Sequence, residues 1–132
     1  MQTFTIRTTK RTEFINIDKY IREALKNSDV KDGIICVYVP HTTAGITINE
    51  NADPDVIRDI EEVLEKLIPW KGNYRHIEGN SPAHVKASLV GSSVHLIVNN
   101  GELILGTWQS VFFCEFDGPR TRQFYVEIIS KK

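Results

Sequence analysis

The C-terminal third of the chain constrains the fold more than any other part. Residues 92 to 129 are rich in β-branched and aromatic residues and are interrupted by two turn sequences, "NNG" at residues 99–101 and "DGP" at residues 117–119. A short turn such as "NNG" joins the two strands of a hairpin. We therefore predict a hairpin followed by two long strands, so the rest of the chain must pack on an antiparallel sheet.

The preceding residues predict further strands and three helices. Alternation predicts strands at residues 2–7 and 13–17, the apolar run 34–39 predicts a strand covered on both faces, and residues 45–50 alternate as a half-exposed strand does. Apolar residues recur at helical spacing in three segments. These begin near residue 17, with Asn16 or Asp18 as cap; at residue 54, with Asp53 as cap and Pro54 in the first position; and after Ser81 as cap.

The fold class follows from this order of elements. We predict an α+β fold in a single domain spanning residues 1–132, with antiparallel β-sheets in a sandwich-like core and about three helices packed on one side. A chain of 132 residues has enough apolar surface for one such core and too little for two.

Charge and hydropathy exclude several classes of partner. The chain has 16 basic and 17 acidic residues, so no broad positive field favours nucleic acid. Its apolar runs are far shorter than a membrane span, and its first residues lack the apolar core of a signal peptide, so we expect no membrane partner and a cytoplasmic location. Cys36 and Cys114 lie in apolar stretches without a CxxC partner, and we expect buried free thiols.

Two histidines flank a short loop before the third helix. His84 falls in the first helical turn, and His76 precedes it by a Gly-Asn loop, so both rings face one pocket if the chain doubles back at Gly79. Taken singly, each is more often a structural hydrogen-bonding residue than a ligand. The spacing matches no standard zinc pattern, so both interpretations stay open.

The third candidate, His41, follows a predicted buried strand in the sequence "HTTAG". Functional side chains are often presented at strand ends, although His41 is equally explained as a polar residue leaving the core. If residues 34–40 and 46–50 form a tight hairpin, Glu50 lies about 13 Å from His41. Glu50 then joins the site only through a strand bend or across a subunit boundary. Asp53 is explained by helix capping or by a divalent-ion site.

Two later motifs bear side chains suited to a phosphorylated ring. In "GTWQ", Trp108 either packs in the core or stacks on a heteroaromatic ring whose edge Gln109 recognises. In "FDGPRTR", Arg120 and Arg122 point the same way if they lie on a strand, which suits either a solvated turn or bidentate phosphate recognition. We expect a structural or exposed role for His95.

The motifs "HTTAGITINENADPDV", "HIEGNSPAHVKASLVG", "GTWQ" and "FDGPR" together resemble the YjbQ family, small proteins associated with a secondary thiamine-phosphate synthase activity. The resemblance covers residues 41–128 and implies a compact α+β domain assembled as a homotrimer. It marks His41, Glu50, Asp53, His76 and His84 as candidate catalytic residues, with the three histidines as candidate metal ligands. The candidate substrate-binding residues are Thr43, Asn80, Ser88, Gln109, Asp117 and Arg120.

The activity implied by the resemblance joins hydroxymethylpyrimidine diphosphate to thiazole phosphate and releases pyrophosphate. The expected partner is thus a small phosphorylated heteroaromatic substrate, and a divalent metal ion, zinc or magnesium, is the expected cofactor. Two alternatives stay open. One is a non-catalytic housekeeping protein that binds a metal or a phosphorylated metabolite, and the other is a metal-dependent hydrolase.

Overall fold

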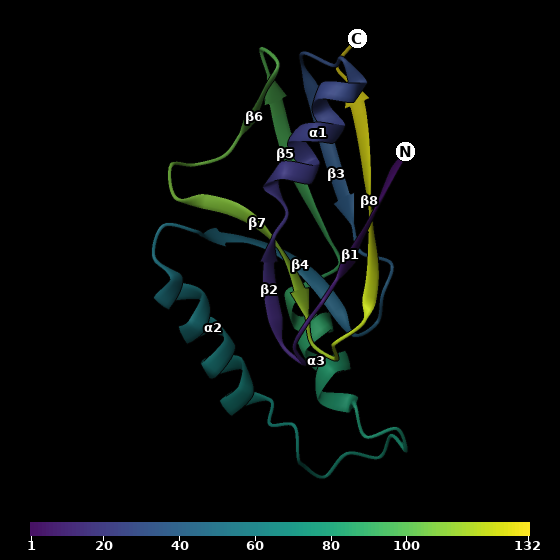
Figure 1. Cartoon of the computed structure of the whole chain (residues 1–132), viewed down its shortest axis with the longest axis vertical. Coiled ribbons are helices and arrows are strands. Elements are labelled where there is room, and N and C mark those ends of the chain that lie inside the picture. The colour runs from purple at the N-terminus through teal and green to yellow at the C-terminus, as the bar shows by residue number, and fades with distance from the viewer.

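Two antiparallel sheets pack face to face in the computed structural model, which describes residues 1–132 (Figure 1). Sheet A has five strands in the order β1-β8-β3-β5-β6, and sheet B has three in the order β2-β7-β4. The strands of sheet A are β1 (Gln2–Arg7), β8 (Thr121–Ser130), β3 (Gly33–Tyr38), β5 (Ser93–Asn99) and β6 (Glu102–Ile104). Those of sheet B are β2 (Glu13–Asn16), β7 (Gln109–Glu115) and β4 (Ala44–Glu50). The helices are α1 (Asp18–Ser28), α2 (Pro54–Leu67) and α3 (Ser81–Val90). The predicted fold class is confirmed.

The main core lies between the two sheets and is formed by the side chains that point inward from alternate positions along the strands. Sheet A turns residues such as Ile35 and Phe124 inward, sheet B contributes Val111 and Phe113, and α1 adds Ile21. These five side chains are completely buried. Each such side chain stabilises the fold by roughly 1.5–3 kcal/mol relative to an exposed one. This core therefore holds the two sheets against each other.

The opposite face of sheet B carries a smaller core against α3. Phe112, Cys114 and Phe116 point to this side and pack on Ala83 and Ala87 of the helix. Burial raises the pKa of the Cys114 thiol, which therefore stays protonated and unreactive. Cys36, expected to be buried, is only half-buried, and both cysteines are free as predicted.

Helix α2 lies along the edge of this smaller core and is covered on one side only (Figure 1). Asp53 is its N-cap, its side chain accepts a hydrogen bond from the Asp55 N–H at 2.9 Å, and Pro54 occupies the first turn, as predicted. No residue within the helix is fully buried, and Val63 and Leu67 are exposed. None of the three helices is long and apolar enough to cross a membrane.

Four local predictions are wrong. The strand at residues 34–39 is covered on one face only, because the outer face of sheet A has nothing packed on it within the chain, and Ile34 and Tyr38 remain 50% and 46% exposed. The segments 34–40 and 46–50 form no hairpin, because β3 belongs to sheet A and β4 to sheet B. The N-cap of α3 is Asn80 and not Ser81, and that of α1 is Ile17 and not Asn16 or Asp18.

Candidate functional site

Two chain crossings between the sheets meet at one end of the sandwich. After β3 the chain passes from sheet A to sheet B through residues 39–43, and after β7 it returns from sheet B to sheet A through residues 116–120. Ala44 pairs with Glu115 in sheet B, and the Phe116 N–H donates to the Thr43 carbonyl oxygen at 3.2 Å. The two crossings therefore lie side by side, with the start of α3 beside them.

A hollow of about 350 Å³ opens among these three segments. We call it the histidine hollow; its lining residues are Pro40, His41, Thr42, Thr43, Glu78, Asn80, His84, Arg120 and Arg122. A second hollow of about 370 Å³ shares His41, Thr42 and His84 with it and extends along α3 to Ser88. His84 lies in the first turn of α3, as predicted, where the helix dipole favours an anion. Spaces of this size suit a small organic ligand.

A buried ion pair supports one wall of the histidine hollow. Arg122 Nε donates to Glu115 Oε1 at 2.9 Å and Nη2 donates to Glu115 Oε2, while Nη2 also donates to Thr43 Oγ1 at 2.8 Å. Glu115 is completely buried and Arg122 is 4% exposed. Burial alone would raise the pKa of Glu115, but hydrogen bonds from Arg122, the Asp117 N–H and Thr8 outweigh it and lower that pKa. Both groups are therefore charged at neutral pH. The Thr43 hydroxyl, predicted to bind substrate, accepts a hydrogen bond from the Arg122 guanidinium instead.

Asn80 joins the start of α3 to the turn before β8. Its Nδ2 donates to Asp117 Oδ2 at 2.9 Å, and Arg120 Nη2 donates to the same oxygen at 2.6 Å. An asparagine at an N-cap usually accepts a backbone hydrogen bond, but this side chain makes no such bond, and its Oδ1 is buried without a partner. The Asn80 side chain therefore does not cap the helix, and instead it holds Asp117, which in turn fixes Arg120 at the hollow.

His41 is held by a backbone donor. The Gln123 N–H donates to His41 Nε2 at 3.0 Å, so Nε2 carries the lone pair and the proton of the neutral ring resides on Nδ1. Partial burial and the charge of Arg122 both lower the pKa of His41, which keeps the ring neutral at pH 7. In this arrangement His41 presents an N–H donor to the hollow.

His76 and His84 lie beside each other, as the doubling back of the loop predicts. Their ring centroids are 5.6 Å apart and the rings are nearly perpendicular. His76 is also 3.9 Å from the Glu78 carboxylate. This pair suits a shared ligand, but His41 does not fit as a third metal ligand because the Gln123 N–H occupies its proton-free nitrogen. No group of three His, Cys, Asp or Glu side chains in the chain is arranged to hold a metal ion.

The remaining candidates lie elsewhere. Glu50 pairs with Gln109 at the far end of sheet B, six residues along β4 from Ala44, or roughly 20 Å at about 3.3 Å per residue. Gln109 Oε1 accepts from the Gly106 N–H, and Trp108 is 63% exposed, so its indole does not pack in the core. Asp53 caps α2. Ser88, at the edge of the second hollow, donates to the His84 carbonyl oxygen.

Glu115 was not among the predicted site residues, and Arg122, considered for phosphate recognition, was not predicted to lie in a buried ion pair. The signal for them was present: Glu115 follows the buried Phe113 by two residues, and Arg122 precedes the buried Phe124 by two. Residues two apart on a strand share a face, so both charges had to point inward and to need each other.

Comparison with known proteins places these motifs in one family. Residues 2–131 match the model of the family described as UPF0047 protein YjbQ-like. The chain is 58% identical to the UPF0047 protein MJ1081 of Methanocaldococcus jannaschii, over 98% of this chain and 94% of that protein, and 52% identical to YugU of Bacillus subtilis, over 98% of each. A crystal structure of an uncharacterised YjbQ/UPF0047 protein from Clostridium acetobutylicum superposes with a TM-score of 0.96 at 53% identity, covering 98% of this chain and 100% of that one. A protein of unknown function from Sulfolobus solfataricus gives 0.94 at 30% identity, over 98% and 96%.

Proposed function

The chain belongs to the UPF0047 family of YjbQ-like proteins, and from this membership and the side chains of the histidine hollow we propose that it is a cytoplasmic secondary thiamine-phosphate synthase. It joins hydroxymethylpyrimidine diphosphate to thiazole phosphate and releases pyrophosphate. One observation supports this proposal above the others. Imidazole rings and guanidinium groups from three separate segments line a single hollow large enough for a phosphorylated ring.

The proposed reaction needs no protein nucleophile. The thiazole nitrogen attacks the methylene carbon of the pyrimidine, a C–N bond forms, and the C–O bond to the diphosphate breaks. The nitrogen becomes a thiazolium cation and the electron pair leaves on pyrophosphate, so charge balances without a proton transfer. What the protein must supply is alignment of the two rings and donors for the oxygen on which charge develops.

The residues of the histidine hollow suit these two tasks. Arg120 is fixed by Asp117 and keeps its Nη1 free of protein partners, and His41 offers an N–H donor. His84 lies in the first turn of α3, where the helix dipole also favours negative charge. A divalent ion held by His76 and His84 would add positive charge for the diphosphate, and the proposed steps do not depend on it.

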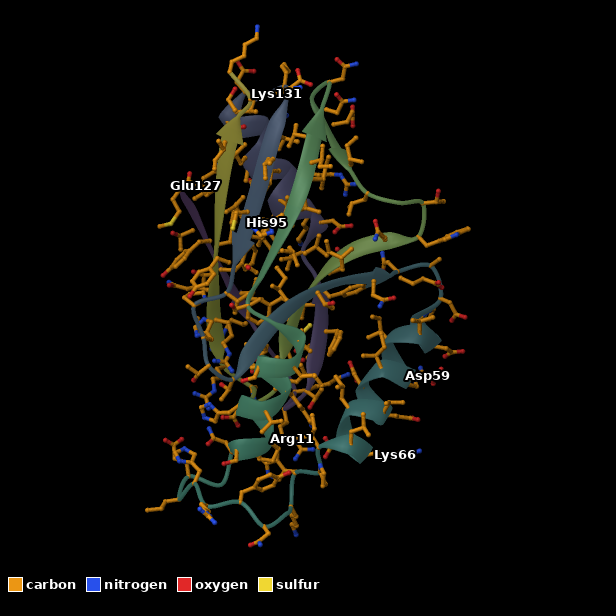
Figure 2. The ribbon with its side chains drawn as sticks, turned by 180° about the vertical axis from the view of Figure 1, so that it is seen from behind. Arg11, Asp59, Lys66, His95, Glu127 and Lys131 are labelled. Carbon is orange, nitrogen blue, oxygen red and sulfur yellow. The ribbon has the colours of Figure 1, made fainter.

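Assembly as a homotrimer is part of the proposal. The outer face of sheet A, viewed directly in Figure 2 around His95, exposes an isoleucine row formed by Ile34, Ile97 and Ile129, which line a hollow of about 460 Å³. An exposed apolar row of this kind favours a protein contact. A second copy would also explain how Glu50 and Gln109, far from the hollow within one chain, come to act at a site.

Turnover of the two precursors tests the proposal. Thiamine monophosphate formed by the wild type is measured beside His84→Ala, Arg120→Ala and, as matched control, Arg58→Ala, which changes an exposed arginine of α2 away from the hollow. We expect the first two variants to lose at least tenfold in rate and the control to match the wild type. Equal, measurable rates in all four proteins would rule the site out, whereas no product from the wild type would refute the synthase and favour a non-catalytic binding protein.

A further inference from the structure

The hydrogen bonds of Arg122 leave one of its nitrogens without a partner. Nε and Nη2 are taken by Glu115 and Thr43, and no protein atom accepts from Nη1. This nitrogen is not sealed inside the protein, because Asn80 Oδ1 is the only buried side-chain polar atom without a partner. Arg122 lines the histidine hollow, so the free surface of this otherwise buried guanidinium faces that space.

His41 supplies a second donor from the same wall. Its Nε2 is occupied by the Gln123 N–H, and its Nδ1 has no protein partner and is likewise not sealed. The two side chains are fixed by the same two segments. Gln123, which holds His41, follows Arg122 in β8, and Arg122 donates in turn to Thr43, two residues after His41.

We infer that Arg122 Nη1 and His41 Nδ1 form an oxyanion subsite that takes a phosphoryl group, and that His41 serves there as a hydrogen-bond donor and not as a metal ligand. The inference deepens the proposed function and takes from it only that the ligand carries a phosphoryl group. Arg122 thereby becomes a ligand-binding residue.

The chemistry of the two donors selects the ligand. Both groups are N–H donors, and neither offers an acceptor in this arrangement, so an oxygen with several lone pairs satisfies them best. The charge of Arg122 is balanced by Glu115 and that of Arg120 by Asp117. An anion is therefore bound by directed hydrogen bonds more than by a net positive field. Glu78, which is 72% exposed at the rim, disfavours anions on its own side and so directs the phosphoryl group toward Arg122.

Pyrophosphate titrated calorimetrically into the full chain tests the subsite. The variants are His41→Phe, which removes the donor, and Arg122→Lys, which keeps the charge facing Glu115 but loses Nη1. Arg58→Lys is the matched control because Arg58 lies exposed on α2, away from the histidine hollow. We expect each subsite variant to weaken binding roughly tenfold or more, which is the loss of one charge-assisted hydrogen bond, and the control to bind as the wild type does.

Two outcomes overturn the inference: binding that is unchanged in both subsite variants, and no pyrophosphate binding by the wild type. If Arg122→Lys fails to fold, His41→Phe and nitrogen NMR of the wild-type histidines decide. His41 must show a protonated Nδ1 that responds to pyrophosphate, and a protonated Nε2 would refute the assignment.

The reaction assay separates this inference from the proposed function. A protein that binds pyrophosphate through these residues yet forms no thiamine monophosphate supports the subsite and refutes the synthase. A protein that forms thiamine monophosphate but binds pyrophosphate equally well in the wild type and in both subsite variants supports the synthase and refutes the subsite.

Discussion

Removing the charge of Glu115 should destabilise the fold far more than removing a surface carboxylate. Glu115→Gln keeps the shape of the side chain but leaves the Arg122 guanidinium, 4% exposed, without its counterion. Loss of one partner of a buried pair costs about 3–5 kcal/mol, and we expect the lower end because Nη1 faces the hollow and can be hydrated. The entropy of unfolding is about 2.1 cal/mol/K per residue, or roughly 0.28 kcal/mol/K for 132 residues, so Tm should fall by about 10 °C.

Thermal unfolding followed by circular dichroism measures this effect against two further variants. Asp55→Asn breaks an exposed ion pair with Arg58, in which both side chains are about two-thirds exposed, and should cost less than about 1 kcal/mol. Glu115→Gln combined with Arg122→Met removes both buried charges and should recover most of the lost stability. A drop in Tm for Glu115→Gln no larger than that for Asp55→Asn, or a double variant no more stable than the single one, would refute the reasoning.

Three further predictions concern α2, acid stability and metal binding. Leu64→Ala should lower the free energy of unfolding by about 1–2 kcal/mol because Leu64 packs on the smaller core. Leu67→Ala, at a 69% exposed position, should change it by less than about 0.5 kcal/mol. Similar losses for both variants in urea unfolding would refute this orientation of α2. Folding lowers the pKa of Glu115 from 4.5, so the stability that its charge contributes is complete above about pH 5 and is lost as pH falls through the folded pKa. Below pH 5, Tm should therefore drop less steeply for Glu115→Gln than for the wild type. Parallel curves of Tm against pH for the two proteins would contradict the shift. Zinc titrated calorimetrically should bind more weakly to His84→Ala but equally well to His41→Phe, and dependence on His41 would show that the ring ligates metal.

The elements of the fold followed from local sequence, but their partners did not. The turn at residues 99–101 was predicted from its residue types, and Asn100 and Gly101 indeed have positive φ angles of 55° and 77°. The placement of β3 and β4 in different sheets depends on long-range pairing with β8 and β7, which periodicity does not encode. The same limit explains the error about β3, whose continuous apolar run has one face in the core and one on the exterior.

The part of the candidate site that is local in sequence was also predictable. His76, Asn80 and His84 lie close in sequence around one loop, so their proximity followed from a turn and a helix start. Joining them to His41 and Arg120 required the two sheet crossings, which only the tertiary fold brings together. The tautomer of His41 depends on one backbone N–H from β8, and no motif in the sequence indicates that bond.

The most direct test of the proposed site is the location at which hydroxymethylpyrimidine diphosphate binds the isotopically labelled full chain, measured by amide chemical-shift changes. We predict the largest changes at residues 41–43, 80–84 and 117–123, which surround the histidine hollow. Changes confined to the far end of sheet B, around Glu50 and Trp108, would contradict it, as would a spectrum that does not respond to the ligand.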